Sequence, residues 1–213
     1  MEYKLTLDEG RFLVKLARKA VEEYLSSAVI IKPPPETPKR LWEKRGVFVT
    51  IERIVVDPVS RKASRLLRGC IGYPEPIMPL VEADIKAAIA AATQDPRFPP
   101  LSLRELKEVI FEVSVLTPPQ KVEYKDPLEL LDKIQVGRDG LIIESGYARG
   151  LLLPQVPVEY NWNVEEFLNH ACVKAGLRED AWREGRVTVY KFQAQIFVEV
   201  TPDGEVIERE LWA

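Results

Sequence analysis

Histidine and cysteine are scarce in this sequence of 213 residues, which contains one histidine, His170, and two cysteines, Cys70 and Cys172. Zinc sites built from four cysteines, from two cysteines and two histidines, or from three histidines therefore cannot form within one chain. A Cys–His dyad or a Ser-His-Asp triad would have to use His170. A magnesium or calcium site made of carboxylates alone stays open, but the spacing of an EF-hand or a Walker loop is absent. The sequence predicts no metal ligands and leaves any cofactor unknown.

Long apolar runs and a large excess of charge of one sign are also missing. The longest apolar tract, residues 87–92, is much too short to span a membrane, and residues 1–5 lack the charged-then-apolar order of a signal peptide. These features predict a cytoplasmic protein with no membrane partner. Because the chain has 30 basic and 33 acidic side chains, a nucleic-acid partner would have to bind a local basic patch.

The length and the order of the expected elements indicate the fold class. At 213 residues, 46% of them hydrophobic, the chain is expected to form a single domain over 1–213, or one domain with a smaller lobe. Helical periodicities and strand-like runs alternate irregularly, and several strand pairs are joined by short turns. This pattern predicts an α+β protein with a mainly antiparallel sheet flanked by helices.

Local signals place most of these elements. The pairs Thr6/Glu9 and Asn163/Glu166 are capping boxes, each followed by an apolar helical repeat. The expected helices cover about 6–24, 79–93, 102–106 and 163–176, and the expected strands cover 47–56, the segment around 68–70, 109–116, 149–153 and 187–200. Hairpins are expected over 134–143 and at 202–204.

The segment Leu66–Gly72 combines an apolar strand with two glycines, an arginine and one of the two cysteines. Because side chains alternate along a strand, Arg68 and Cys70 are expected on one face. Leu67 and Ile71 are then expected on the other, the core face. A guanidinium group two residues from a thiol can lower the pKa of the thiol and favour the reactive thiolate.

The same segment predicts a functional site. Gly69 and Gly72 leave backbone uncovered, which permits close approach by a ligand or a second chain. Cys70 is then a ligand contact or a catalytic nucleophile; the alternative is a small buried hydrophobe, because free cysteine is among the most buried residue types. Cys172 falls on the apolar face of a capped helix, which indicates core packing. A Cys70–His170 dyad stays open.

The loop Asp95–Phe98 is more unusual than a generic turn. Since Pro96 fixes the backbone between two opposite charges, Arg97 could bind a carboxylate or phosphate through its planar fork. The alternative is a helix-terminating turn with an Asp95–Arg97 contact, and both interpretations can hold together. Gln155, after a proline at a strand end, could present its amide to a ligand or mark the end of the strand.

A run of basic residues raises the question of a nucleic-acid partner. The run comprises Arg53, Arg61, Lys62, Arg65 and Arg68. Such a run can track a phosphate backbone. Charge runs on loops are usually solvated, and this run lacks the interleaved aromatic residues that stack bases. Nucleic-acid binding is therefore the less favoured interpretation.

Taken in order, these segments resemble the AMMECR domain family over essentially the whole chain. The resemblance rests on Leu67–Gly72, Ala91–Pro100 and Leu151–Gln155, then on Trp162 with Glu166–Leu168 and on Lys174–Leu177 with Trp182. The charge level and the prolines make the chain similar to archaeal members. The resemblance implies an α+β fold with a larger and a smaller lobe, the smaller at approximately 55–85, and a cleft near Arg68–Gly72.

The resemblance names no activity. Prokaryotic members often have genes beside those of a Memo-like protein and a radical S-adenosylmethionine protein, which implies a shared modification pathway. The leading hypothesis is a ligand-binding or catalytic cleft that binds a small anionic ligand. Its residues are Arg68, Gly69, Cys70, Gly72, Asp95, Arg97 and Gln155. The alternative is a non-enzymatic module in which the glycines and the basic loop dock a partner protein, so the sequence leaves open whether the chain is an enzyme.

Overall fold

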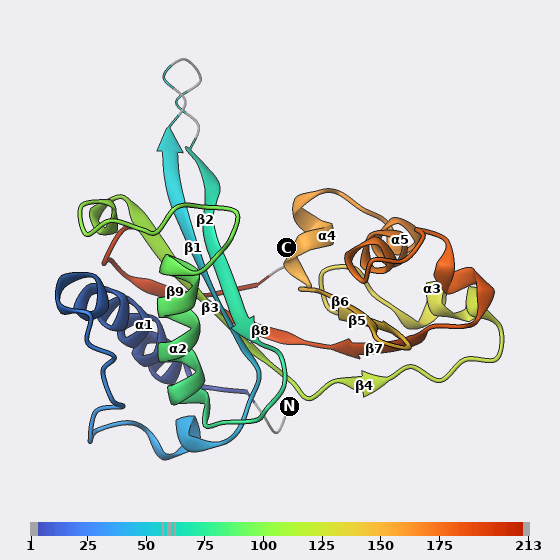
Figure 1. Ribbon diagram of the computed structural model, residues 1–213, viewed down its shortest axis with the longest axis horizontal. Coiled ribbons are helices and arrows are strands. Elements are labelled where there is room, and N and C mark those ends of the chain that lie inside the picture. Colours follow the sequence, from blue (N-terminus) through green and yellow to red (C-terminus); the bar gives the residue numbers. More distant parts are fainter. Residues whose placement is uncertain (1–3, 57, 59–60, 62, 211–213) are drawn as a thin grey trace. The chain divides into compact units, whose positions relative to one another are not determined.

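The computed structural model describes residues 4–56, 58, 61 and 63–210 and is drawn in Figure 1. The chain divides into two compact units. Unit 1 contains residues 1–116 and 195–209, and unit 2 contains residues 117–194 and 210–213. Each unit has helices and an antiparallel sheet, which confirms the α+β prediction. No helix in the described ranges is long and apolar enough to cross a membrane.

Unit 1 is built on a five-stranded sheet of order β2-β1-β3-β8-β9. Its strands are β1 (Val47–Val56), β2 (Ala63–Tyr73), β3 (Val109–Leu116), β8 (Ala194–Glu199) and β9 (Val206–Arg209). β1 is antiparallel to both β2 and β3, and β8 is antiparallel to β9. β1 and β3 have the bounds expected from the sequence. Residues 55–85 lie within unit 1.

Two long helices of unit 1, α1 (Leu7–Ser27) and α2 (Leu80–Thr93), pack against this sheet (Figure 1). The expected capping box of α1 is present, with reciprocal bonds between Thr6 and Glu9. Two 3-10 turns, η1 (Lys39–Trp42) and η2 (Glu105–Lys107), complete the unit. The buried cluster between helices and sheet contains Val49 and Ile51 of β1. Because side chains alternate along a strand, the intervening Thr50 faces away from this core.

A buried arginine joins distant segments of unit 1. Arg18 of α1 donates from Nε to Glu199 Oε1 of β8 at 2.8 Å. Its Nη1 and Nη2 donate to the carbonyl oxygens of Leu106 and Val109, at 2.8 and 2.7 Å. Glu199 in turn accepts the backbone N–H of Phe111 at 3.0 Å. A paired, fully hydrogen-bonded guanidinium can be buried without an unsatisfied charge, so this network fixes α1, β3 and β8 together.

Unit 2 contains a four-stranded sheet of order β4-β7-β5-β6. Its strands are β4 (Gln120–Lys121), β5 (Gly140–Ser145), β6 (Ala148–Leu152) and β7 (Thr188–Phe192). Its helical elements are η3 (Pro127–Glu129), α3 (Leu130–Lys133), α4 (Gln155–Glu159), α5 (Val164–Lys174) and η4 (Ala181–Glu184). The capping box of α5 is present, and Cys172 lies in the core as expected.

Two predictions of local structure are wrong. The hairpin expected over 134–143 instead joins β5 to β6, across a turn in which Gly146 has φ +58°. The strand expected over 187–200 is broken at Gln193, whose N–H donates to Thr117 Oγ1 at 2.8 Å instead of to a strand. The short helix expected after Ser102 is present as the 3-10 turn η2. The hairpin at 202–204 is present, with β8 paired to β9.

Candidate functional site

The segment Leu66–Gly72 lies on β2, where it carries a β-bulge. Ile51 of β1 pairs with Gly69 and the next residue, Glu52, pairs with Leu67, so Arg68 is an extra residue in the strand. A bulge interrupts the alternation of side chains. The expected assignment of faces is therefore wrong for part of the segment, and Leu67, expected in the core, is 40% exposed.

Arg68 and Cys70 have different surroundings as a result. Arg68 binds Glu105 near η2, whereas Cys70 accepts a hydrogen bond from Thr50 Oγ1, at 3.1 Å from its sulfur. Since Thr50 faces away from the core cluster, Cys70 lies on that opposite face too. Ile71 packs against the core, as expected.

Cys70 belongs to a polar row that crosses three strands. Thr50 of β1 is opposite Cys70 on one side and opposite Glu112 of β3 on the other. Glu112 is buried and accepts a hydrogen bond from Arg209 at 2.9 Å. Neither Thr50 nor Glu112 was predicted as a site residue. The signal for Glu112 was a charged residue in the middle of the mostly apolar run of β3.

The thiol of Cys70 is held in its protonated form. Burial raises its pKa to about 11, against the opposing effects of the Thr50 hydrogen bond and the positive charge of Arg97. The carboxylates of Glu112 and Asp95 raise the pKa further. The expected lowering of the thiol pKa by Arg68 does not occur, because desolvation is the largest effect and the cation that opposes it is Arg97, whereas Arg68 is paired with Glu105.

Asp95 holds Arg97 in a fixed orientation. The guanidinium donates from Nε to Asp95 Oδ1 at 2.9 Å and from Nη2 to Oδ2 at 2.7 Å, and the backbone N–H of Arg97 donates to Oδ1 at 3.1 Å. These bonds, with Arg97 as the main cause, lower the pKa of Asp95 to about 2. The Asp95–Arg97 contact predicted from the sequence is therefore confirmed. The Arg97 side chain remains 51% exposed, whereas that of Asp95 is 2% exposed.

The same pair contacts the backbone of β2, the outermost strand on its side of the sheet. Cys70 N donates to Asp95 Oδ2 at 2.8 Å, and Arg97 Nη2 lies 3.5 Å from the carbonyl oxygen of Cys70. A carboxylate and a guanidinium thus replace the acceptor and donor that a neighbouring strand would offer. This contact brings segments 68–72 and 95–98 together.

Glu105 collects two arginines beside the bulge. Arg68 Nε and Arg53 Nη2 donate to Glu105 Oε1 at 3.0 and 3.1 Å. Ser102 donates to the other carboxylate oxygen from its N–H and its hydroxyl, at 2.9 and 3.0 Å. Although partial burial acts in the opposite direction, the hydrogen bonds from Arg68 and Ser102 lower the pKa of Glu105 to about 2. The Arg68 guanidinium is thus already paired with a carboxylate.

Phe98 lies next to both guanidinium groups. The central carbon of the Arg97 guanidinium is 5.5 Å from the centroid of the ring, and that of Arg68 is 5.9 Å from it. Cations at this range are attracted by the ring quadrupole. The result is a partly exposed surface made of one aromatic ring and two oriented guanidinium groups.

The space beside each of the two glycines of β2, Gly69 and Gly72, is filled by other atoms of the chain. A Cβ on Gly69 would lie 2.1 Å from the carbonyl oxygen of Ala91 in α2, and a Cβ on Gly72 would lie 2.4 Å from the Phe48 ring and the carbonyl oxygen of Val47. The expected close approach therefore exists, but helix α2 and strand β1 make it. Neither glycine needs a ligand to explain it.

Gln155 belongs to unit 2, where it begins α4 and is 5% exposed. Strand β6 ends at Leu152, close to the expected strand end, and the short helix α4 follows it. Unit 1 alone brings together Arg68, Gly69, Cys70, Gly72, Asp95 and Arg97. Over the described ranges 4–56, 58, 61 and 63–210, no group of three or more Cys, His, Asp or Glu residues is placed to hold a metal ion.

Comparison with known proteins identifies the family. The sequence pattern of AMMECR1 matches residues 14–197, which include the whole of this site. The chain belongs to the AMMECR1 family. The resemblance to this family inferred from the sequence is thereby confirmed.

Similar AMMECR1-family chains are archaeal and of the same length. A protein of Thermofilum pendens is 66% identical over 98% of this chain and 98% of its own length. Protein MJ0810 of Methanocaldococcus jannaschii is 54% identical over 97% of this chain and 98% of its own. The crystal structure of the uncharacterized protein PH0010 from Pyrococcus horikoshii has 55% sequence identity and a TM-score of 0.89, covering 95% of this chain and 97% of that chain.

Proposed function

We propose that this AMMECR1-family protein binds the anionic group of a small ligand at Arg97 and Phe98, with Cys70 as a neutral contact. One observation carries the proposal: a buried carboxylate, Asp95, fixes a guanidinium that is half exposed. An oriented guanidinium loses less freedom on binding than a mobile one, and its fork matches a carboxylate or phosphate.

The surroundings support binding more than covalent chemistry. A cysteine nucleophile acts as the thiolate, and the raised pKa of Cys70 keeps that form rare at neutral pH. The nearest carboxylates, those of Glu112 and Asp95, oppose its formation further. Catalysis by Cys70 stays a prediction. The partly buried thiol can still contact a ligand as a weak donor.

Titration calorimetry with inorganic phosphate and with oxalate tests this function. Arg97→Gln should weaken binding about tenfold, because a charge-assisted hydrogen bond contributes roughly 1.5–3 kcal/mol. Arg104→Gln, at an exposed arginine in the same unit, is the matched control and should change the affinity less than about twofold. Asp95→Asn tests the positioning role and should weaken binding while Arg97 is still present. Equal effects of the Arg97 and Arg104 variants would refute the proposal.

A second candidate function, a protein-interaction module, is favoured by exposed apolar residues near the end of the β1–β2 pair. Leu66 is 54% exposed, Val56 is 53% exposed and Leu67 is 40% exposed. Because side chains alternate along a strand, Leu67 and Val56 lie on one face of the pair and Leu66 lies on the other. Exposed apolar residues on neighbouring strands are typical of a surface that another protein covers. Co-purification with a Memo-like protein that is lost in Leu66→Ser but survives alkylation of Cys70 would favour this function over ligand binding. The shared pathway with Memo-like and radical S-adenosylmethionine proteins stays a prediction.

Nucleic-acid binding through the arginine run receives less support. Arg53 and Arg68 are paired with Glu105, and Arg65 lies 3.6 Å from Glu52. These carboxylates reduce the positive field that a phosphate backbone needs. Lys62 lies outside the described residues. Binding that weakened steeply with salt would revive this function. We also propose a cytoplasmic location, which the two free cysteines support.

A further inference from the structure

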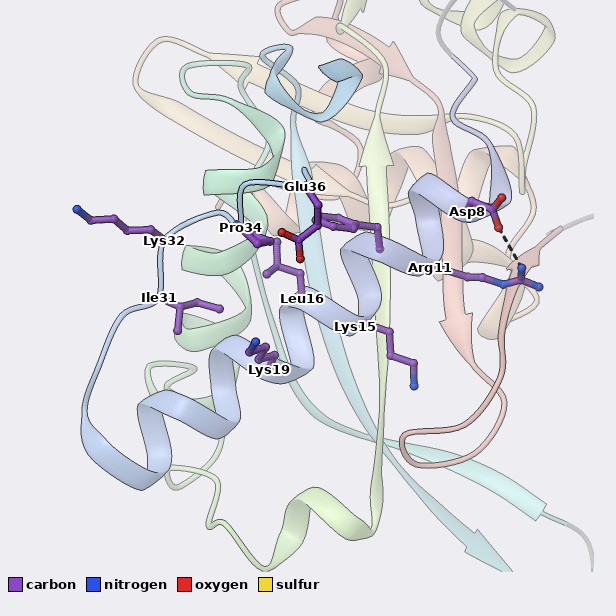
Figure 2. Close-up of a pocket in the computed structure, with 10 residues that line it drawn as sticks. Asp8, Arg11, Lys15, Leu16, Lys19, Ile31, Lys32, Pro34 and Glu36 are labelled. Carbon is purple, nitrogen blue, oxygen red and sulfur yellow. Dashed lines mark hydrogen bonds and ion pairs between the residues drawn. The ribbon is translucent and has the colours of Figure 1, made fainter. Parts of the chain in front are cut away.

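A groove separate from the β2 site runs along α1. It has a volume of about 480 Å³ and lies between one face of α1 and the extended segment 31–36 (Figure 2). The lining residues are Asp8, Arg11, Phe12, Lys15, Leu16, Lys19, Ile31, Lys32, Pro34 and Glu36. The volume falls within the usual range for small-molecule sites. No residue of this groove belongs to the site at β2.

The floor of the groove is apolar and held by the core of unit 1. Leu16 belongs to the buried cluster, and Phe12 and Ile31 pack against it. Pro34 lies in a segment in which the Thr37 hydroxyl donates to the Pro34 carbonyl oxygen at 2.6 Å. Helix α1 thus forms one wall, and the packing of Ile31 on the core and the Thr37–Pro34 hydrogen bond hold the segment that forms the other.

Several charges around the groove are already paired. Arg11 binds Asp8 at 3.1 Å, and Lys15 binds Asp203 at 2.9 Å. Lys19 on α1 and Glu36 on the opposite wall form no ion pair or hydrogen bond with the described residues 4–56, 58, 61 and 63–210. Figure 2 shows the Glu36 carboxylate directed toward Leu16 and shows Lys19 at the end of the groove near Ile31. Lys19 and Glu36 therefore flank an apolar floor, whereas the side chain of Lys32, which also lines the groove, extends away from α1 in Figure 2.

We infer that this groove binds an apolar carboxylic acid that also carries an N–H group, such as an N-acylated apolar amino acid. The carboxylate of the ligand contacts Lys19, its N–H donates to Glu36, and its apolar side chain covers Phe12 and Leu16. A plain anion lacks the donor for Glu36, and a plain amine would face Lys19 with a like charge. A ligand that carries both a carboxylate and an N–H group matches Lys19 and Glu36 together.

Three probes separate the two polar contacts. N-acetyl-phenylalanine has the carboxylate and the N–H, its C-terminal amide lacks the carboxylate, and 3-phenylpropanoate lacks the N–H. Binding is measured by amide chemical shifts of the whole isotope-labelled protein. The wild type should bind N-acetyl-phenylalanine about threefold more tightly than either of the other two, because threefold corresponds to about 0.65 kcal/mol, a typical contribution of an exposed charged contact. The shifts should occur at residues 11–19 and 31–36.

Two variants then assign each contact. Lys19→Gln should remove the preference for the acid over its amide and keep the preference for the ligand with an N–H. Glu36→Gln should weaken the preference for N-acetyl-phenylalanine over 3-phenylpropanoate and should not weaken the preference for the acid. Both residues are exposed, so both variants should fold. Lys86→Gln, at an exposed lysine of α2 that does not line the groove, is the charge-matched control. Absence of shifts at the groove, or equal effects of the Lys19 and Lys86 variants, would overturn the inference.

Discussion

The buried carboxyl group of Asp84 makes a contribution to stability that falls as pH rises. Asp84 lies within α2, is 0% exposed, and neither of its carboxyl oxygens has a hydrogen-bond partner among the described residues. Burial raises its pKa well above the ordinary value for aspartate. Folding therefore takes up a proton at this site. The change we consider is Asp84→Asn, which removes the titration and keeps the size of the side chain.

The size of the effect follows from proton linkage. The folded state holds the proton of Asp84 above the pH at which the unfolded chain releases it, near 3.9. The contribution of Asp84 to stability is therefore fully present below about pH 3.9. It is lost by about 1.4 kcal/mol for each pH unit as pH rises toward the folded pKa. From pH 4.5 upward, the free energy of unfolding of Asp84→Asn should therefore rise relative to wild type, by at most about 1.4 kcal/mol for each pH unit over which the folded state keeps its proton.

Guanidinium unfolding at pH 4.5, 5.5 and 6.5 measures this difference. Because the chain has two compact units, hydrogen exchange of α2 amides identifies the transition that belongs to unit 1. Glu82→Gln, on the same helix at a partly buried position, controls for the loss of one carboxyl group. A stability difference between Asp84→Asn and wild type that stays constant from pH 4.5 to 6.5 would refute the reasoning. So would an equally steep change in Glu82→Gln.

Three further predictions concern the β2 site. Gly69→Ala should destabilise unit 1 by about 2 kcal/mol or more, because its Cβ would lie 2.1 Å from the Ala91 carbonyl oxygen, and a large fall in melting temperature would show it. Asp95, whose pKa is lowered to about 2, should contribute about 2 kcal/mol of stability that is present above pH 4 and lost as pH falls through about 2. Unfolding curves of Asp95→Asn and wild type at pH 3 and 6 test this. An equal stability difference between the two proteins at both pH values would contradict it. Since the pKa of Cys70 is raised to about 11, its alkylation by iodoacetamide should be slow at pH 7 and accelerate about tenfold per pH unit, whereas a rate that levels off below about pH 8.5 would disprove the protonated thiol.

The sequence predicts the helices of this protein better than its strands, for local reasons. The capping boxes at Thr6 and Asn163 depend on side chains three residues apart, so the sequence contains the whole interaction. The bulge at Arg68 depends on how β2 pairs with β1. No local pattern within Leu66–Gly72 indicates the extra residue. A single extra residue is enough to exchange the faces to which the side chains beyond it point.

The site shows the same division. Asp95 and Arg97 are two positions apart in the sequence, and their contact was predicted. The hydrogen bond from the Cys70 N–H to Asp95 joins residues 25 positions apart and was not predicted. The lowering of the Cys70 pKa expected from Arg68 does not occur, because the sequence shows the arginine without showing that Glu105 binds it. Desolvation, which sets the pKa of Cys70, depends on burial that only the folded chain defines.

The interruption of unit 1 in the sequence has a consequence for biosynthesis. Residues 1–116 leave the ribosome without β8 and β9, so β3 is an open border of the nascent sheet although all eight of its residues are buried in the finished protein. Glu199, the partner of Arg18, arrives 83 residues after the end of β3, which at typical translation rates takes roughly 4–17 s. Unit 2 has emerged by then almost entirely. The sheet of unit 1 thus cannot be completed until β8 and β9 have been synthesised. A truncated chain that ends within unit 2 leaves the edge of β3 open to pairing with other chains.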